Sequence, residues 1–255
     1  DSFKLNYQLR TVESDQVLDS ISDDVAILFL TEVDYRTGKK HDILKLTTKA
    51  KKFNVITIWD LAHSLGVLPI NLKRLKVDFA VGCTYKYLNG GPGSPAFLYA
   101  APQHHKQLQN PIKGWLGHSS PFNFEPNYLA GNGIATMQIG TPSIIAFIAL
   151  EASLDIFDRV EISEVRKKSM ELTDLFIAHT NKNCPQLRLI SPVSAESRGA
   201  HVAYRFKEGY AVIQCLIEHG VIGDFRAPDL MRFGFNPLFI DCNDATIRNC
   251  RSFIR

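Results

Sequence analysis

The sequence has little of what would assign it to a specialised class of protein. No apolar run approaches the roughly 20 residues needed to cross a bilayer, so we expect no membrane partner. The 29 lysine and arginine residues nearly balance the 26 aspartate and glutamate residues, and the net charge is only +3. Because the two signs are interspersed and form no basic patch, the sequence indicates no nucleic-acid partner.

Cysteine is scarce and forms no CxxC pair. The odd number leaves at least one thiol unpaired within the chain, which contains Cys83, Cys184, Cys215, Cys242 and Cys250. Reduced thiols in a cytoplasmic protein are the simpler interpretation. No metal-ligand spacing occurs either, so we expect no metal site.

The remaining composition is that of an ordinary globular protein. Apolar residues make up 45% of 255 residues, which is enough for one large domain or two smaller ones. The chain begins with Asp1 and ends at Arg255 inside a helix predicted from Asn243 to Ile254. From these ends we expect a piece of a longer chain.

The first half alternates buried strands with amphipathic helical segments, which predicts an α/β fold with a mainly parallel sheet. Strands are predicted at 25–30, 55–59, 77–81 and 96–100, with a helix over 41–54. Two long helices, 143–157 and 163–181, then lead into a smaller α+β unit with strands at 187–190, 202–206, 221–225 and 230–233 and a helix over 210–219. We therefore divide the chain into a large domain, 1–141, and a connecting helix with a small C-terminal domain, 142–255.

One irregular stretch separates these parts. Residues 113–132 are rich in glycine, proline, asparagine and aromatic residues and show no period. A loop of this length in a compact domain is usually functional or packed against a partner. It is a natural place for a second subunit to contribute to a site.

Two short segments carry the chemistry. The stretch WDLAHS, with Asp60 and His63, follows one predicted strand, and TYKYLNGGPG, with Lys86, follows the next. Parallel strands bring their carboxyl ends to one edge, where ligands bind. Each residue alone has a structural explanation, as a helix cap or a solvated charge. Together they suit pyridoxal phosphate, whose aldehyde condenses with a lysine and whose ring nitrogen needs an anionic partner.

The segments WDLAHS, DFAVGCTYKYLNGGPGSPAFLY, GWLGH, GTPS and RFGFNPLF resemble those of kynureninase, in order and spacing, over about residues 25–239. This resemblance implies the pyridoxal-phosphate fold type I of aspartate aminotransferase. It also implies hydrolysis of the amino acid L-kynurenine to anthranilate and L-alanine in tryptophan catabolism and NAD biosynthesis. The hydroxylated substrate 3-hydroxykynurenine is an alternative, and the family works as a homodimer with sites at the subunit boundary.

The resemblance also implies individual roles. Lys86 would bind the cofactor and serve as the base at the substrate Cα, Asp60 would pair with the ring nitrogen, and His63 would contact the ring. Cofactor phosphate contacts are implied for Tyr85, which would also deliver a proton to the substrate, for Trp115 through its indole N–H, and for Thr141, where several members have asparagine. Thr31 matches a hydroxyl residue near the cofactor.

Substrate recognition is assigned to the C-terminal part. Arg232 would bind the substrate α-carboxylate, because a guanidinium pairs with a planar carboxylate through two hydrogen bonds. Arg226 is a competing candidate for this role. His118 and Phe122 are candidates to flank the aromatic ring of the substrate.

Two other functions compete with this interpretation. One is a different enzyme of the same fold, such as a cysteine desulfurase, which would need a reactive cysteine on a mobile loop. The other is a non-catalytic dimerisation or binding module that retains Lys86 without a complete cofactor site. A visible absorbance band from bound cofactor separates the module from an enzyme, and the reaction product separates the two enzymes.

Overall fold

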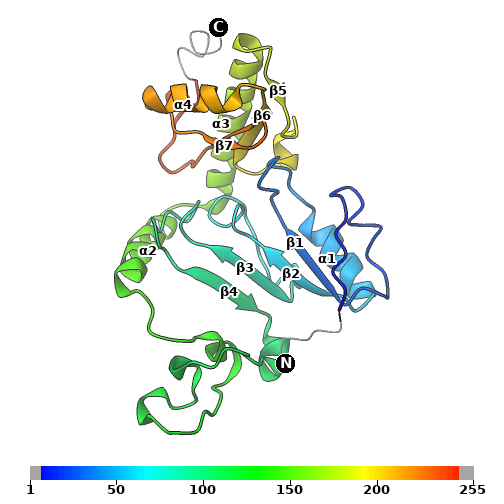
Figure 1. The fold of residues 1–255 in the computed structure, drawn as a ribbon, viewed down its shortest axis with the longest axis vertical. Coiled ribbons are helices and arrows are strands. Elements are labelled where there is room, and N and C mark those ends of the chain that lie inside the picture. The colour runs from blue at the N-terminus through cyan, green and yellow to red at the C-terminus, as the bar shows by residue number, and fades with distance from the viewer. Residues whose placement is uncertain (1–6, 247–255) are drawn as a thin grey trace.

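Two four-stranded sheets, one from each half of the chain, organise the molecule (Figure 1). The computed structural model describes residues 7–246. In the first sheet, β1 (Ile27–Thr31), β2 (Ile56–Asp60) and β3 (Phe79–Cys83) are parallel neighbours, and β4 (Ala96–Ala100) runs antiparallel to β3. The predicted α/β fold with a mainly parallel sheet is confirmed.

Helix α1 (Ile43–Lys52) connects β1 to β2 and covers part of the sheet. It begins at Asp42, whose side chain accepts a hydrogen bond from the Lys45 backbone N–H, a standard N-cap contact. Its apolar face is buried in the same cluster as Trp59 of β2. The indole Nε1 of Trp59 donates to the Thr47 hydroxyl at 3.1 Å, which fixes the helix against the strand.

The register of the parallel strands brings their carboxyl ends to one edge. Thr31 lies beside Asp60, and Asp60 lies beside Val81. The segments that follow β2 and β3 therefore leave the sheet side by side. This edge faces the second half of the chain.

The second sheet has the order β5-β6-β8-β7 and is antiparallel throughout. Its strands are β5 (Arg188–Leu189), β6 (His201–Arg205), β7 (Asp224–Arg226) and β8 (Leu230–Gly234). Helices α3 (Ile162–Asn183) and α4 (Gly209–Glu218) pack against it (Figure 1). Together they bury an apolar cluster that includes Leu172, Phe176, Tyr204, Ile213, Met231 and Phe233.

The turn formed by residues 34–40, called here the β1 turn, connects the two halves of the chain through hydrogen bonds. Backbone hydrogen bonds run from Lys40 to the Ser197 carbonyl and from Gly199 to the Gly38 carbonyl, both at 2.8 Å. Gly38 has a φ of +72°, and a Cβ there would lie 2.7 Å from the His201 carbonyl oxygen. Only glycine therefore allows this close approach.

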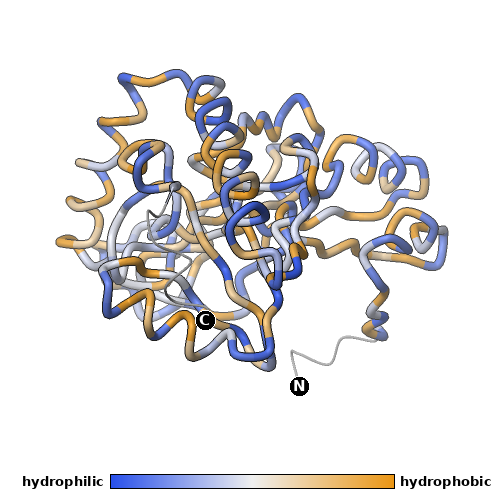
Figure 2. Tube along the Cα trace, turned by 90° about the horizontal axis from the view of Figure 1, so that it is seen from above, coloured by the Kyte–Doolittle hydropathy of each residue, from blue (hydrophilic) through white to orange (hydrophobic). Residues whose placement is uncertain are grey.

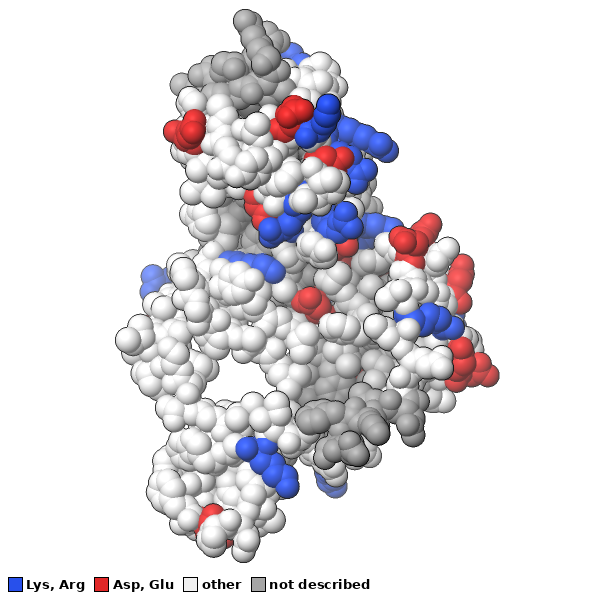
Figure 3. All heavy atoms as spheres, in the orientation of Figure 1, with Lys and Arg blue, Asp and Glu red and all other residues white. Residues whose placement is uncertain are grey.

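Residues 102–143, called here the excursion, separate β4 from helix α2 (Ile144–Phe157). Its regular structure is limited to short 3₁₀ turns, Pro102–Gln107, Trp115–Gly117, Pro121–Asn123 and Gly133–Met137. The excursion projects away from both sheets (Figure 1), and an opening separates it from them in Figure 3. Few charged side chains lie on this lower part of the molecule in Figure 3.

Several predicted boundaries differ from the structure, for example the start of the first strand, which is predicted at Val25 and lies at Ile27. Strand β3 begins at Phe79 and not at Val77, because the Asp78 side chain bonds the Thr57 backbone N–H at the start of the strand. Strand β7 begins at Asp224 and not at Val221, whose N–H still bonds the Leu216 carbonyl of α4. Helix α5 covers Cys242–Ala245, and most of the helix predicted over 243–254 lies outside the described residues.

Hydrophobic stretches of the chain are short and interrupted by hydrophilic residues (Figure 2). Within residues 7–246, no helix has both the length and the apolar character required to cross a membrane. The same part of the chain contains no cluster of three or more histidine, cysteine, aspartate or glutamate side chains arranged to hold a metal ion.

Candidate active site

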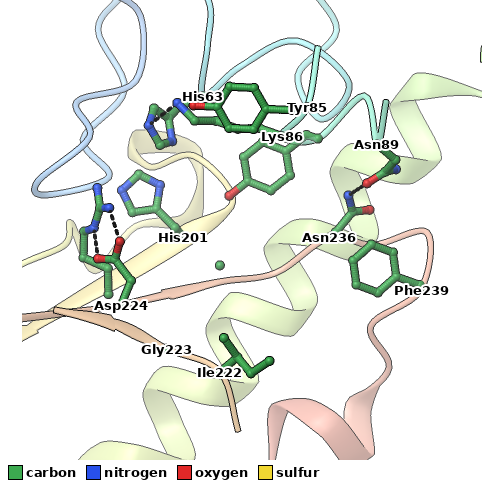
Figure 4. A pocket seen from close by; sticks show the side chains of 13 residues that line it. His63, Tyr85, Lys86, Asn89, His201, Ile222, Gly223, Asp224, Asn236 and Phe239 are labelled. Atoms are coloured by element: carbon green, nitrogen blue, oxygen red, sulfur yellow. Dashed lines mark hydrogen bonds and ion pairs between the residues drawn. The ribbon is translucent and has the colours of Figure 1, made fainter. Parts of the chain in front are cut away.

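A pocket of about 430 Å³ lies between the two sheets (Figure 4). One wall comes from the segments after β2 and β3, and the other from the second sheet and its connections. The first wall includes His63, Tyr85, Lys86, Tyr87 and Asn89. The second wall includes His201, Ile222, Asp224, Arg232, Gly234, Asn236 and Phe239.

Lys86 and His63 meet at the first wall. The Lys86 Nζ lies 3.0 Å from the His63 Nε2, and a dashed line marks this contact in Figure 4. A lysine ammonium has only donors, so the imidazole nitrogen accepts this hydrogen bond. Burial, reinforced by the charge of Lys86, lowers the pKa of His63 to about 3. His63 is therefore neutral at physiological pH.

The turn between β2 and His63 is ordered by Asp60. Its Oδ1 accepts a hydrogen bond from the Ala62 backbone N–H at 2.8 Å, and the Leu61 N–H bonds the Val81 carbonyl of β3. These bonds hold His63 close to the segment that carries Lys86. Asp60 thus helps to shape the first wall of the pocket.

Tyr85 lies at the open side of the pocket and is about half exposed. The Lys86 Nζ lies 5.5 Å from the centre of its ring. The neighbouring Cys83 thiol, together with burial, raises the pKa of Tyr85 above its ordinary value. Its phenol therefore stays protonated at neutral pH.

Arg232 is held by contacts on two sides. Its Nε and Nη2 donate to the two carboxylate oxygens of Asp224 at 2.7 and 2.6 Å. Its Nη1 donates to the backbone carbonyl of Tyr35 in the β1 turn. The guanidinium carbon also lies 5.8 Å from the centre of the Tyr35 ring. Arg232 therefore joins the second sheet to the first.

His201 is buried at the back of the pocket, and its ring centre lies 5.2 Å from that of His63. Neither ring nitrogen has a hydrogen-bond partner within the described part of the chain, although the Tyr35 backbone is close enough to influence its pKa. Burial, followed by the charge of Arg232, lowers the pKa of His201 to about 4. A buried polar group without a partner usually marks a water or ligand position.

The pairing of β6 with β8 explains how His201 and Arg232 share one face of the sheet. Ala203 lies opposite Arg232, and His201 lies two residues along the same strand, opposite Gly234. Residues two apart in a strand point to the same side. Gly234 has no side chain, which leaves the space between His201 and Tyr87 open.

Of the predicted site residues, the structure brings His63, Tyr85, Lys86 and Arg232 into the pocket. Four others lie outside its lining. Asp60 ends β2, and the Thr31 hydroxyl donates to the Val33 carbonyl at 3.0 Å beside it. Trp115 and the exposed Thr141 belong to the excursion. The cofactor roles of seven of these residues and the substrate role of Arg232 stay predictions.

The weaker candidates also lie outside the lining. Arg226 forms an ion pair with Asp224 at 2.9 Å. Within the excursion, His118 contacts the Asn127 carbonyl, and the Phe122 ring packs edge-on against Trp115. Sequence reasoning missed His201, Asp224 and Asn236. A hairpin closed by Pro228-Asp229 could have indicated Asp224, because it places residue 224 opposite residue 232.

The fold defines a broad class. The chain superposes on a cysteine desulfurase from Thermococcus onnurineus with a TM-score of 0.77 and 17% sequence identity, covering 91% of this chain and 60% of that one. It therefore has the fold of the pyridoxal-phosphate enzymes of fold type I.

Sequence comparison gives a narrower assignment. Residues 165–248 match the family described as "Kynureninase C-terminal domain". The chain is 46% identical to a kynureninase from Pseudomonas fluorescens over 242 residues, and 42% identical to one from Deinococcus radiodurans over 239. These matches cover 94% and 93% of the chain, which is related by sequence to the kynureninases. It spans 58% of the length of both relatives.

Proposed function

We propose that this protein is a kynureninase, which hydrolyses the Cβ–Cγ bond of L-kynurenine to give anthranilate and L-alanine. One observation carries the proposal. Lys86 of the kynureninase-like segment YKYLNGGPG and His63 of the segment WDLAHS meet at 3.0 Å in a pocket between the sheets. The hydroxylated substrate 3-hydroxykynurenine fits the same proposal.

The chemistry of the pocket residues fits pyridoxal phosphate. The lining offers a lysine amine next to a neutral imidazole, and the volume of about 430 Å³ lies within the range of small-ligand sites. Lys86 would hold the cofactor through its aldehyde, His63 would contact the ring, and Asp60 would pair with the ring nitrogen. When bound, the cofactor supplies an electron sink for negative charge at the substrate Cα.

The side chains of this protein would position the substrate and move its protons. Lys86 Nζ would move the proton at the substrate Cα. Tyr85 would deliver a proton to the substrate from its phenol, which holds a proton at neutral pH. Arg232, buried in the second wall, would bind the α-carboxylate.

Other features support the wider assignment. The parallel sheet and the antiparallel sheet fall on either side of the proposed boundary between residues 141 and 142. Exposed apolar side chains on α2 and the excursion favour a homodimer, in which Trp115 and Thr141 would reach the phosphate of the partner's cofactor. We infer an amino-acid substrate and a cytoplasmic location, with no nucleic-acid or membrane partner.

The direct test uses the full-length protein loaded with pyridoxal phosphate. Adding L-kynurenine should produce anthranilate, followed by its fluorescence, together with an equal amount of L-alanine. The Lys86→Ala variant should lose at least about 1,000-fold in activity, because both the attachment point and the base are removed. Full activity in this variant would contradict the assignment.

The same assay separates the rival functions. A cysteine desulfurase would release sulfur from cysteine and give no anthranilate, but none of the described pocket residues is a cysteine. A non-catalytic module would show no visible cofactor band that borohydride removes. Either result would reject the kynureninase proposal.

A further inference from the structure

Arg232 and Asp224 form the strongest charge pair in the pocket, and the fold dictates their meeting. Asp224 of β7 lies directly opposite Arg232 of β8 in the antiparallel register. Side chains directly opposite each other in such a pair are close neighbours. The hairpin therefore places the carboxylate against the guanidinium before any ligand arrives.

The Asp224 carboxylate occupies only one edge of the Arg232 guanidinium. Asp224 takes the edge formed by Nε and Nη2, and the Tyr35 carbonyl takes one hydrogen of Nη1. Arginine has five N–H groups. Two N–H groups therefore remain, one on Nη1 and one on Nη2, and these two nitrogens form the outer edge of the guanidinium. A planar carboxylate can bind this edge through two parallel hydrogen bonds.

Few other contacts hold the Arg232 guanidinium, so its orientation depends on Asp224. The Arg232 side chain is 11% exposed, so water provides little of its hydrogen bonding. The imidazoles of His63 and His201, which also line the pocket, have no negative charge in any protonation state and cannot replace the Asp224 carboxylate. Without Asp224, one hydrogen bond to the Tyr35 carbonyl would be left to hold the guanidinium.

We propose that Asp224 is a positioning residue that fixes the plane of Arg232 so that its free edge binds the carboxylate of an amino-acid substrate. This inference rests on the proposed function, in which Arg232 binds that carboxylate. Asp224 does not compete for the ligand, because it occupies the Nε–Nη2 edge of the guanidinium and leaves the outer edge free.

The test compares two ligands that differ by one carboxylate. L-Alanine and ethylamine are titrated into the full-length, cofactor-loaded protein, and the absorbance change of the cofactor gives both dissociation constants. In Asp224→Ala, the preference for L-alanine over ethylamine should fall about 10- to 100-fold, the value of hydrogen bonds to a charged group. With L-kynurenine, KM should rise more than kcat falls.

A matched control tests whether loss of any ion pair in this hairpin has the same effect. Asp229, in the turn of the same hairpin, pairs with Arg205 of β6 at 3.1 Å and does not line the pocket. Asp229→Ala should keep the preference within about twofold, as expected for an ion pair with little coupling to the site. Asp224→Glu, which retains the charge, should restore part of the preference and provides a folded comparison if Asp224→Ala is unstable.

The outcomes separate the inference from the proposed function. Equal loss of affinity for both ligands would mean that Asp224 is only structural, and tighter L-alanine binding would mean that it competes. Either result overturns the inference. If the unaltered protein showed no preference for L-alanine, the carboxylate role of Arg232 in the proposed function would be wrong.

Discussion

The pocket keeps two imidazoles without charge. Burial lowers the pKa of both His63 and His201, and the neighbouring cations Lys86 and Arg232 reinforce the effect. The charged side chains that line the pocket are then Lys86, Arg232 and Asp224. The lysine and the arginine lie on opposite walls, which suits the proposed arrangement with a cofactor held by Lys86 and a substrate carboxylate bound by Arg232.

His201 should make the stability of the protein depend on pH. Its folded pKa of about 4 lies below the ordinary value of 6.5, so the unfolded chain binds more protons between these values. The free energy of unfolding should therefore fall as pH drops from about 6.5 to 4, by on the order of 3 kcal/mol from this residue. The groups that influence its pKa include Arg232, Asp34 and Asp224.

His201→Gln should remove that part of the pH dependence. Denaturant unfolding at pH 7 and pH 4.5 would measure it, with the unaltered protein as reference. The variant should lose less stability than the reference on acidification. Parallel losses in the two proteins would show that His201 does not titrate in this way.

The site residues that were predicted from the sequence have a recognisable local sequence pattern, and the missed residue His201 does not. Lys86 and His63 lie next to apolar strands and a glycine-rich turn, so their local pattern indicated a site. His201 and Asp224 lie in short strands of the second sheet, and their relation to Arg232 depends on strand pairing. Pairing of the distant strands β6 and β8 leaves no local signature, so His201 was not predicted, whereas the hairpin signal that could have indicated Asp224 was not used.

At the scale of the elements, Asp78 anchors the amino-terminal end of β3. Its buried carboxylate accepts hydrogen bonds from Lys51 of α1, from the backbone and hydroxyl of Thr57 of β2, and from His104 after β4. Burial alone would raise the pKa of Asp78, but these hydrogen bonds outweigh it and lower the value to about 2. The contribution of Asp78 to stability is therefore complete above its unfolded pKa of about 4 and is lost as pH falls through about 2.

Asp78→Ala should destabilise the protein by about 2–4 kcal/mol, because several donors lose their acceptor in a buried position. Chemical denaturation at pH 7 would measure the loss. The exposed Asp23 provides a control, since surface substitutions usually change stability by no more than about 0.5 kcal/mol. Equal stability of Asp78→Ala and Asp23→Ala would contradict the anchoring role.

Elements were predictable where apolar residues follow a clear period, as in α1 and the parallel strands. The predicted start of a strand was wrong where a polar contact determines where the strand begins. Asp78 delays β3, and the hydrogen bond from Val221 to α4 delays β7. The 3₁₀ turns Trp115–Gly117 and Pro121–Asn123 of the excursion show no period and could be predicted only as irregular structure.

At the scale of the whole molecule, one side is unusually apolar. Helix α2 exposes Ile145 at 82% and Ile148 at 59%, and the excursion exposes Phe122 and Phe124. Large exposed apolar patches commonly mark protein interfaces. The homodimer proposed above would cover this surface.

Ile145→Glu should therefore shift the full-length protein from dimer toward monomer at micromolar concentration, because a charge would be buried at the interface. Size-exclusion chromatography with light scattering would measure the mass. Val193, 76% exposed near the second sheet, is the matched control, and Val193→Glu should leave the mass unchanged. A monomeric unaltered protein would reject the homodimer.

The β1 turn has a consequence that reaches beyond its own few residues. The Tyr35 carbonyl accepts a hydrogen bond from Arg232, and Gly38 and Lys40 form backbone hydrogen bonds with Gly199 and Ser197. The β1 turn is therefore bonded to the part of the chain that forms the second wall of the pocket. A protease cut between residues 34 and 40 would leave Lys86 and Arg232 chemically intact. It would nevertheless remove one of the links between the two walls, so that the Asn89–Asn236 hydrogen bond would have to carry more of their alignment.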